Sequence, residues 1–244
     1  MVSIPALLAI VFVSAVVQTL LGFGFGMVIM ALIPLLMDLK QAIPLVSFIC
    51  LLMNASLLVH LRRDVARSKF GPLLVGALAG VPCGVLFLRS ASEAVLMLCL
   101  GLVIVAFVIR SLVGLGRTPK DISSGWGYLA GLGGGALGGA FNTGGALPVM
   151  YTSRKPWSPV AVKANLQVFF VGSSVFQVTL FLSSGMLSWE GIRFDLVAFP
   201  AILAGMGAGT LLSRGLDRKK FNNLVLAGLV LMGAVYLYRG AIAL

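Results

Sequence analysis

Apolar runs of membrane-spanning length fill most of the chain. Six of them have roughly the 20 residues that an α-helix needs to cross a bilayer: residues 42–61, 71–88, 94–109, 160–187, 194–213 and 221–238. Only 10% of the 244 residues are charged and 59% are hydrophobic, whereas a water-soluble domain carries about a quarter charged residues. The sequence therefore predicts an all-α polytopic membrane protein. We expect a single transmembrane domain over residues 1–244, with about eight to ten membrane elements.

Two further apolar stretches do not fit one crossing helix each. Residues 4–37 would form a helix of roughly 51 Å, far longer than a hydrocarbon core of about 30 Å, and the glycine-rich residues 22–26 and Pro34 interrupt them. Residues 125–151 are too short for two crossings and are broken at residues 142–145. We expect two hairpins, each of two helical arms meeting at a glycine-rich tip. Such irregular backbone is stable at membrane depth only when it is buried in protein or lines a wet cavity.

The basic residues predict the orientation. If each hairpin returns to its starting side, one set of connections holds fourteen Lys and Arg residues and the other holds four. The positive-inside rule then places the first set in the cytoplasm, both termini outside, the first hairpin on the outer side and the second on the inner side. Because the bases lie between apolar runs, the net charge of +11 does not indicate nucleic-acid binding. The cytoplasmic set is Arg62, Arg63, Arg67, Lys69, Arg110, Arg117, Lys120, Arg154, Lys155, Lys163, Arg214, Arg218, Lys219 and Lys220.

The two halves of the chain resemble each other. Residues 79–89 align without a gap with residues 204–214, and each half begins with a glycine-rich hairpin followed by a proline. We expect two repeats, about residues 4–115 and 125–240, each a glycine-tipped broken-helix hairpin plus three crossing helices. An odd number of crossings inverts the second repeat, which is a plan of secondary transporters with sites near the midplane. Chance similarity is the alternative, because small residues spaced by four recur in many membrane helices.

Ionisable groups that serve catalysis or cation transport are scarce in the predicted spans. We expect no Asp or Glu deep in a span, which disfavours a metal or sodium transporter. An enzyme is also disfavoured, because the chain has no H-E-x-x-H or G-x-S-x-G motif and its one histidine, His60, lies at a helix end. No metal site and no cofactor are predicted. The acidic residues, expected in connections or at helix ends, are Asp38, Asp64, Glu93, Asp121, Glu190, Asp195 and Asp217.

Neutral polar residues occupy the predicted interior instead. Helix amino termini near Gly26 and Gly144 would present free N–H groups and the positive end of the helix dipole, which favour an anion. The alternative is that the polar side chains only hydrogen-bond between helices. Residues expected to share one helix stripe are Lys163, Gln167, Phe170, Ser174, Gln177 and Phe181, with a shorter stripe of Ser47, Cys50 and Asn54. The candidate substrate-binding residues are Gln18, Thr19, Gly24, Gly26, Asn54, Asn142, Thr143, Gly144, Gly145, Lys163 and Gln167.

The duplicated glycine-rich segment ending in proline resembles the TauE/SafE family of sulfite exporters. The resemblance rests on residues 22–26 with Pro34 and on residues 131–135 and 142–145 with Pro148, and it spans nearly the whole chain. It implies a carrier or permease in a bacterial inner membrane for sulfite or a related organosulfur anion such as a sulfonate, with export the expected direction. One departure is the presence of Phe23 and Phe25 where the family often has consecutive glycines.

Three other functions stay open at this point. A permease of the same fold for another small anion or an organic acid has the same sequence features. A membrane scaffold would use the same helices without a polar path, and an intramembrane enzyme would need reactive groups that the sequence does not show. The expected partners are a small anionic substrate, the lipid bilayer and, as a further possibility, a second copy in a homodimer.

Overall fold

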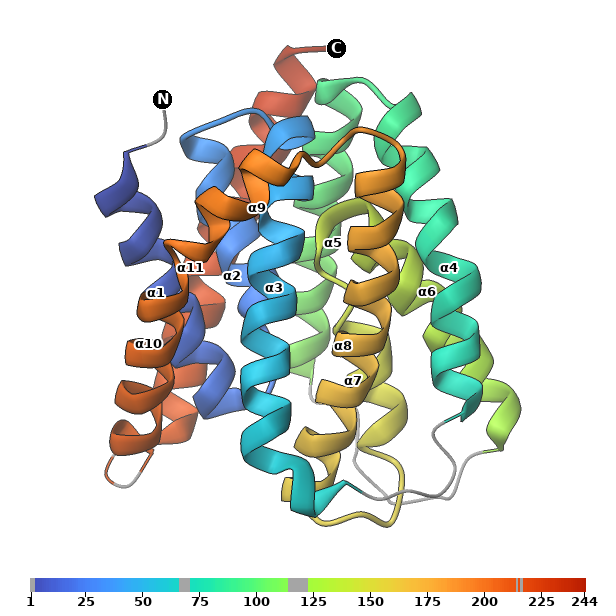
Figure 1. The fold of residues 1–244 in the computed structure, drawn as a ribbon, viewed down its shortest axis with the longest axis vertical. Helices are drawn as coiled ribbons and strands as arrows, with labels where there is room; N and C mark the ends of the chain where they lie inside the picture. Colours follow the sequence, from blue (N-terminus) through green and yellow to red (C-terminus); the bar gives the residue numbers. More distant parts are fainter. Residues whose placement is uncertain (1–2, 66–70, 114–122, 214, 216) are drawn as a thin grey trace.

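The computed structural model describes residues 3–65, 71–113, 123–213, 215 and 217–244 (Figure 1). Every regular element in these ranges is helical. Five predicted cytoplasmic bases lie outside them: Arg67, Lys69, Arg117, Lys120 and Arg214. The helices are α1 (Ile4–Leu21), α2 (Phe25–Leu32), η1 (Ile33–Leu35), α3 (Leu39–Leu61), η2 (Arg62–Asp64), α4 (Gly71–Ser90), α5 (Glu93–Val113), α6 (Ser124–Phe141), α7 (Ala146–Thr152), α8 (Pro159–Ser183), α9 (Trp189–Leu196), α10 (Phe199–Leu212) and α11 (Arg218–Ile242).

Six of these helices are long and apolar enough to cross a membrane, namely α1, α3, α4, α5, α8 and α11. This confirms the prediction of an all-helical membrane protein. The crossing predicted over residues 194–213 is not one continuous helix, since α9 and α10 form a pair bent by 41° that together is long and apolar enough for a seventh span. Pro200, in the first turn of α10, has no N–H to continue a helix from α9. The predicted crossing over residues 160–187 ends earlier, at Ser183, followed by Gly185 in the left-handed conformation with φ 71°.

Both glycine-rich stretches fold as hairpins of one longer and one shorter helix. In the first, α1 ends at Gly22, whose φ of 85° is left-handed, and the chain reverses through Gly24, with φ 105°, into α2. In the second, α6 ends at Asn142, whose φ is 56°, and the chain turns into α7. Glycine adopts this conformation without strain and asparagine tolerates it better than most residues, so each helix stops where the sequence places these residues.

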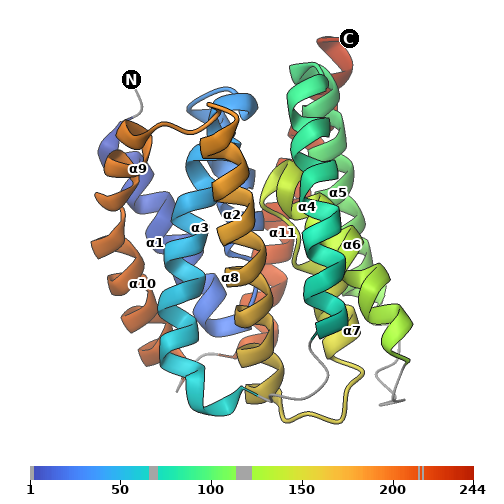
Figure 2. The same cartoon turned by 45° about the vertical axis from the view of Figure 1, so that its right-hand side comes forward.

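Glycine stripes bring two pairs of helices into backbone contact. A Cβ atom on Gly76, Gly80 or Gly84 of α4 would collide with backbone atoms of α6, and the facing glycines of α6 are equally close to α4. In the same way, Gly205 and Gly209 of α10 face the backbone of α1. These are the close approaches that small residues at four-residue spacing permit. Figure 2 shows α4 beside α6 on one side of the bundle and α10 beside α1 on the other.

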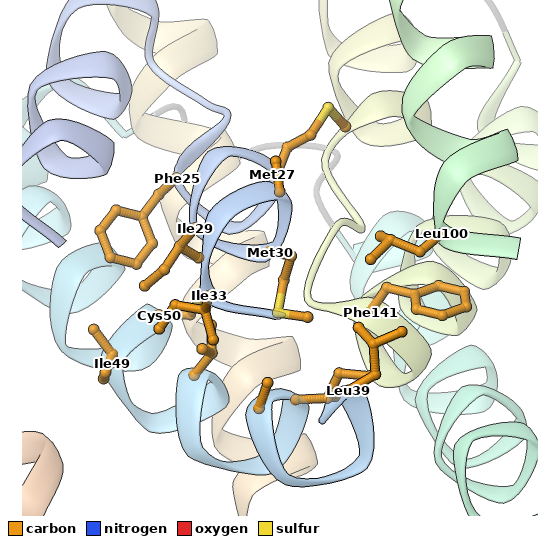
Figure 3. Close-up of a cluster of buried hydrophobic side chains, with 14 of the residues drawn as sticks. Phe25, Met27, Ile29, Met30, Ile33, Leu39, Ile49, Cys50, Leu100 and Phe141 are labelled. Carbon is orange, nitrogen blue, oxygen red and sulfur yellow. The ribbon is translucent and has the colours of Figure 1, made fainter. Parts of the chain in front are cut away.

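The core surrounds the short helix α2. Phe25, Ile29, Met30 and Ile33 are at most 1% exposed and lie in one apolar cluster with α3 side chains such as Ile49 (Figure 3). The buried Tyr236 hydroxyl of α11 donates to the Ala31 carbonyl oxygen at 2.7 Å. A helix of eight residues is marginal alone in water, so this burial holds α2 in place.

The ends of the bundle differ in charge. The carboxyl-terminal ends of α3, α5 and α10 lie at one end of the bundle together with the α7–α8 segment, while the amino-terminal end of α1 and the carboxyl-terminal end of α11 lie at the other (Figure 1). The described bases at the first end include Arg62, Arg63, Arg154, Lys155 and Lys219. The fold therefore separates the connections into the two sets from which the orientation is predicted.

Candidate anion-binding site

The two hairpin tips meet in the interior. A Cβ atom on Gly26, in the first turn of α2, would collide with the carbonyl oxygen of Asn142 at the end of α6. Gly144 packs equally closely on the backbone of α6 at Gly134. Segments more than 100 residues apart in sequence thus form one joint. Because glycine has no side chain, both backbones can approach the same small volume.

A small cavity of about 50 Å³ lies at this joint. One water-sized group needs about 10–15 Å³, so the cavity has room for about four such groups. None of its lining side chains is charged. It is lined by Gln18, Phe23, Gly24, Phe25, Gly26, Met27, Cys50, Asn54, Gly134, Gly138, Asn142, Thr143, Gly144, Gly145, Ala146, Phe169, Phe170, Ser173, Ser174 and Gln177.

The first tip is held by the side-chain amide of Gln18. Its Nε2 donates to Asn54 Oδ1 on α3 at 3.0 Å and to Gln167 Oε1 on α8 at 3.3 Å, and its Oε1 accepts from the backbone N–H of Phe25 at 2.9 Å. Gln18 is only 2% exposed. These bonds satisfy one of the free N–H groups of α2. Gly26 and Met27, the next residues of that first turn, line the cavity.

The second tip is held by the side-chain amide of Asn142. Its Nδ2 donates to the Ile43 carbonyl oxygen at 2.8 Å, and its Oδ1 accepts from Gln177 Nε2 at 3.0 Å. Gln177 also donates to the Gly138 carbonyl oxygen at 3.0 Å. Each tip is therefore tied by one amide side chain to both long helices, α3 and α8. Networks in which buried amides are paired hold their members rigidly.

Thr143 carries a buried hydroxyl group at the joint of the two tips. Its side chain is 2% exposed, it lines the cavity, and its hydroxyl has no hydrogen-bond partner in the described structure. A buried hydroxyl without a partner costs about 1–3 kcal/mol, which a bound acceptor would recover. The cavity thus offers a free hydroxyl, an amide network and the amino-terminal turn of α2 in a neutral setting. This arrangement suits a small oxyanion.

Eight of the eleven predicted site residues line this cavity, and three do not. Thr19 donates to the Ala15 carbonyl oxygen at 2.8 Å and its side chain packs beside Gly209. Lys163 Nζ donates to the Leu20 carbonyl oxygen at 3.0 Å, where a cation caps the end of α1. Gln167 is fully buried behind the cavity and donates to the Gly22 carbonyl oxygen at 3.1 Å. The side chains of Lys163 and Gln167 thus support the first tip from α8.

Several lining residues were absent from the predicted site. Cys50, Phe170, Ser174 and Gln177 belong to the two predicted polar stripes, and that periodicity was the signal that could have placed them. No comparable pattern marks Ser173 or the other residues that were missed. They reach the cavity because the tips enter between α3 and α8. Those residues are Phe169, Gly134, Gly138, Met27 and Ala146. Phe23 and Phe25, which the sequence marks as a departure from the family pattern, also line the cavity.

The expectation of no buried carboxyl group is wrong at one position. Asp195, near the end of α9, is fully buried, and neither carboxyl oxygen has a hydrogen-bond partner among the described residues. The bend between α9 and α10 turns the end of α9 against α3. In one continuous helix over residues 194–213, Asp195 would instead lie in the first turn. No group of three or more His, Cys, Asp or Glu residues in the described ranges could hold a metal ion.

The fold and the site thus define a multi-pass membrane protein with an uncharged cavity between two broken-helix tips. The family model described as Sulfite exporter TauE/SafE matches residues 7–236, and the chain belongs to this family of membrane transporters. It is similar to the probable sulfite/organosulfonate exporter TauE of Cupriavidus necator, with 27% identity over 192 residues that cover 77% of this chain and 73% of the relative. No solved structure matches the chain significantly.

Proposed function

We propose that the protein transports a small sulfur oxyanion, sulfite or an organosulfonate, out of the cell through the joint of the two tips. The observation that carries the proposal is the cavity of about 50 Å³ without a charged wall, whose lining includes Thr143 with its buried hydroxyl that has no hydrogen-bond partner among the described residues. Room for about four water-sized groups fits an anion of that size. The name of the Cupriavidus necator relative supports the choice of a sulfur oxyanion.

Alternating access of two inverted repeats is the mechanism that we propose. It is supported by the pairing of helices: α4 packs on α6 and α10 packs on α1, while α3 packs on α8 and α5 on α11. If each helix of the first predicted repeat is exchanged for its counterpart in the second, α1 for α6, α3 for α8, α4 for α10 and α5 for α11, the same four pairs result. Rocking of one repeat against the other would then open the joint to either side.

We further propose a bacterial inner-membrane location with both termini in the periplasm. This orientation is supported by the described bases at one end of the bundle, at the carboxyl-terminal end of α3, in the α7–α8 segment and at the start of α11. The small anion and the bilayer are the proposed partners. Assembly as a homodimer also stays a proposal.

Uptake into vesicles tests the function directly. Purified protein in liposomes is supplied with sulfite, sulfate, thiosulfate, methanesulfonate or acetate. We expect sulfite or methanesulfonate to enter about tenfold faster than acetate, which corresponds to about 1.4 kcal/mol of selectivity. Preference for acetate would favour an organic-acid permease. Flux no greater than in protein-free vesicles for every anion would contradict transport and favour a scaffold.

The substitution Thr143→Val tests the cavity as the binding site. Valine keeps the shape of threonine but removes the hydroxyl, so we expect the apparent KM for the transported anion to rise about tenfold, equivalent to about 1.4 kcal/mol. That value is near the lower end of the range for a hydrogen bond to a charged group. Uptake at a series of anion concentrations measures it. The matched control is Thr179→Val on α8, whose exposed hydroxyl donates to the Val175 carbonyl oxygen. An unchanged KM in Thr143→Val would remove this residue from the site.

A further inference from the structure

Asp195 is a buried carboxyl group that the proposed anion site does not use. It is 0% exposed, and both of its oxygens lack hydrogen-bond partners in the described structure. An ionised carboxylate without partners is very costly in an apolar interior, so the neutral, protonated carboxyl is the form that suits this place. Within a membrane protein, a buried ionisable residue points to a function in ion movement.

Few ionisable groups surround Asp195. The Cys50 thiol on α3 lies within electrostatic range of it, while Lys40 and His60, the other ionisable residues of α3, are exposed near its ends. On α9 itself, Glu190 and Arg193 are exposed. The helices α10 and α1 contain no ionisable side chain. With no second carboxylate or histidine facing it in this part of the structure, Asp195 can bind a proton but cannot complete a metal site.

The position of Asp195 links it to the anion cavity. Cys50 lines that cavity and is the middle residue of α3 (Leu39–Leu61). Asp195 therefore lies on a helix packed against α3 and within electrostatic range of a residue that lines the cavity. It also lies two residues before Val197, at the bend where α9 gives way to α10. A change in this bend would alter the access of water to the carboxyl group without breaking a long helix.

We propose that Asp195 is a proton-binding site that couples anion movement to proton movement. The inference rests on the proposed function. In the conformation open to one side, the carboxylate takes a proton from water and an O–H bond forms. In the conformation open to the other side, that bond breaks and the proton leaves. One monovalent anion and one proton that move together carry no net charge, so the direction follows the sum of the anion and proton gradients. Export by this route requires an outward anion gradient larger than the inward proton gradient.

The test uses methanesulfonate, the anion of a strong acid, because no proton can travel on it at neutral pH. Vesicles with the full chain are assayed for accumulation driven by an imposed pH gradient and for exchange of labelled against unlabelled anion at equal pH. The proteins are the unchanged chain, Asp195→Asn, Asp195→Glu and the control Glu190→Gln, which removes an exposed acid from the same helix.

We expect Asp195→Asn to keep exchange and to lose about tenfold in pH-driven accumulation, within the range usual for coupling between two ligands. Asp195→Glu should restore part of the loss, and Glu190→Gln should match the unchanged protein. Accumulation by Asp195→Asn equal to that of the unchanged protein would overturn the proposal. Exchange without any response to the pH gradient in the unchanged protein would also overturn it.

Two further readouts separate the possible failures. If Asp195→Asn does not fold, the unchanged protein is tested in vesicles that contain a pH indicator. Proton entry together with downhill methanesulfonate entry would support the proposal. Methanesulfonate entry without proton entry would overturn it. If the unchanged protein moves neither sulfite nor methanesulfonate, the proposed function fails and the proton site falls with it.

Discussion

Gly80→Leu should prevent the protein from folding stably in the membrane. A Cβ atom at this position already collides with the Leu132 carbonyl oxygen of α6 and lies too close to the Ala136 nitrogen. Both contacts are with backbone, which cannot rotate away as a side chain can. The helices α4 and α6 would have to separate, and overpacking of this kind costs about 1–3 kcal/mol or more. We expect the yield of membrane-extracted protein to fall at least severalfold and the Tm in detergent to drop.

A matched control separates the effect of packing from that of adding an apolar side chain. Gly207 lies on α10, is exposed, and has no atom within 4 Å of a Cβ built on it. Gly207→Leu should therefore keep a Tm close to that of the unchanged protein. Equal stability of Gly80→Leu and Gly207→Leu would show that α4 and α6 do not pack backbone to backbone.

Gly26→Val should slow transport by about two orders of magnitude while the chain still inserts. Valine at this position cannot avoid the Asn142 carbonyl oxygen, so the two tips must move apart. The shift would disturb the hydrogen bonds that Gln18 and Asn142 make at the tips. Displacement of about 1 Å in a site costs about a hundredfold in rate in well-studied enzymes, and we expect a loss of that order in anion uptake.

The control for this substitution is Gly228→Val on α11, where a built Cβ meets no atom within 4 Å. It should transport anions at the rate of the unchanged protein. Uptake rates in vesicles, normalised to the amount of inserted protein, measure both variants. Normal uptake by Gly26→Val would mean that the anion does not pass the joint of the two tips.

Local chemistry was enough to predict most of the helical plan. The scarcity of charged residues requires a bilayer, and the left-handed Gly22 and Asn142 end α1 and α6 within the segments where the glycine-rich sequences predicted the reversals. The four-residue spacing of Gly76, Gly80 and Gly84 can also be read from the sequence, and it permits the close packing of α4 on α6. These features depend on residues near one another in sequence, so composition and periodicity reveal them.

Contacts between segments distant in sequence determine which polar side chains are buried and which partners they have. The sequence shows neither that Lys163 caps the end of α1 nor that Thr143 keeps a free hydroxyl beside the cavity. Asp195 has the sequence position of a helix-end residue, and only the bend between α9 and α10 turns it into the interior near Cys50. Hydropathy and spacing determined which segments enter the membrane. Which polar groups lose water, and which find partners there, depends on how those segments pack in three dimensions.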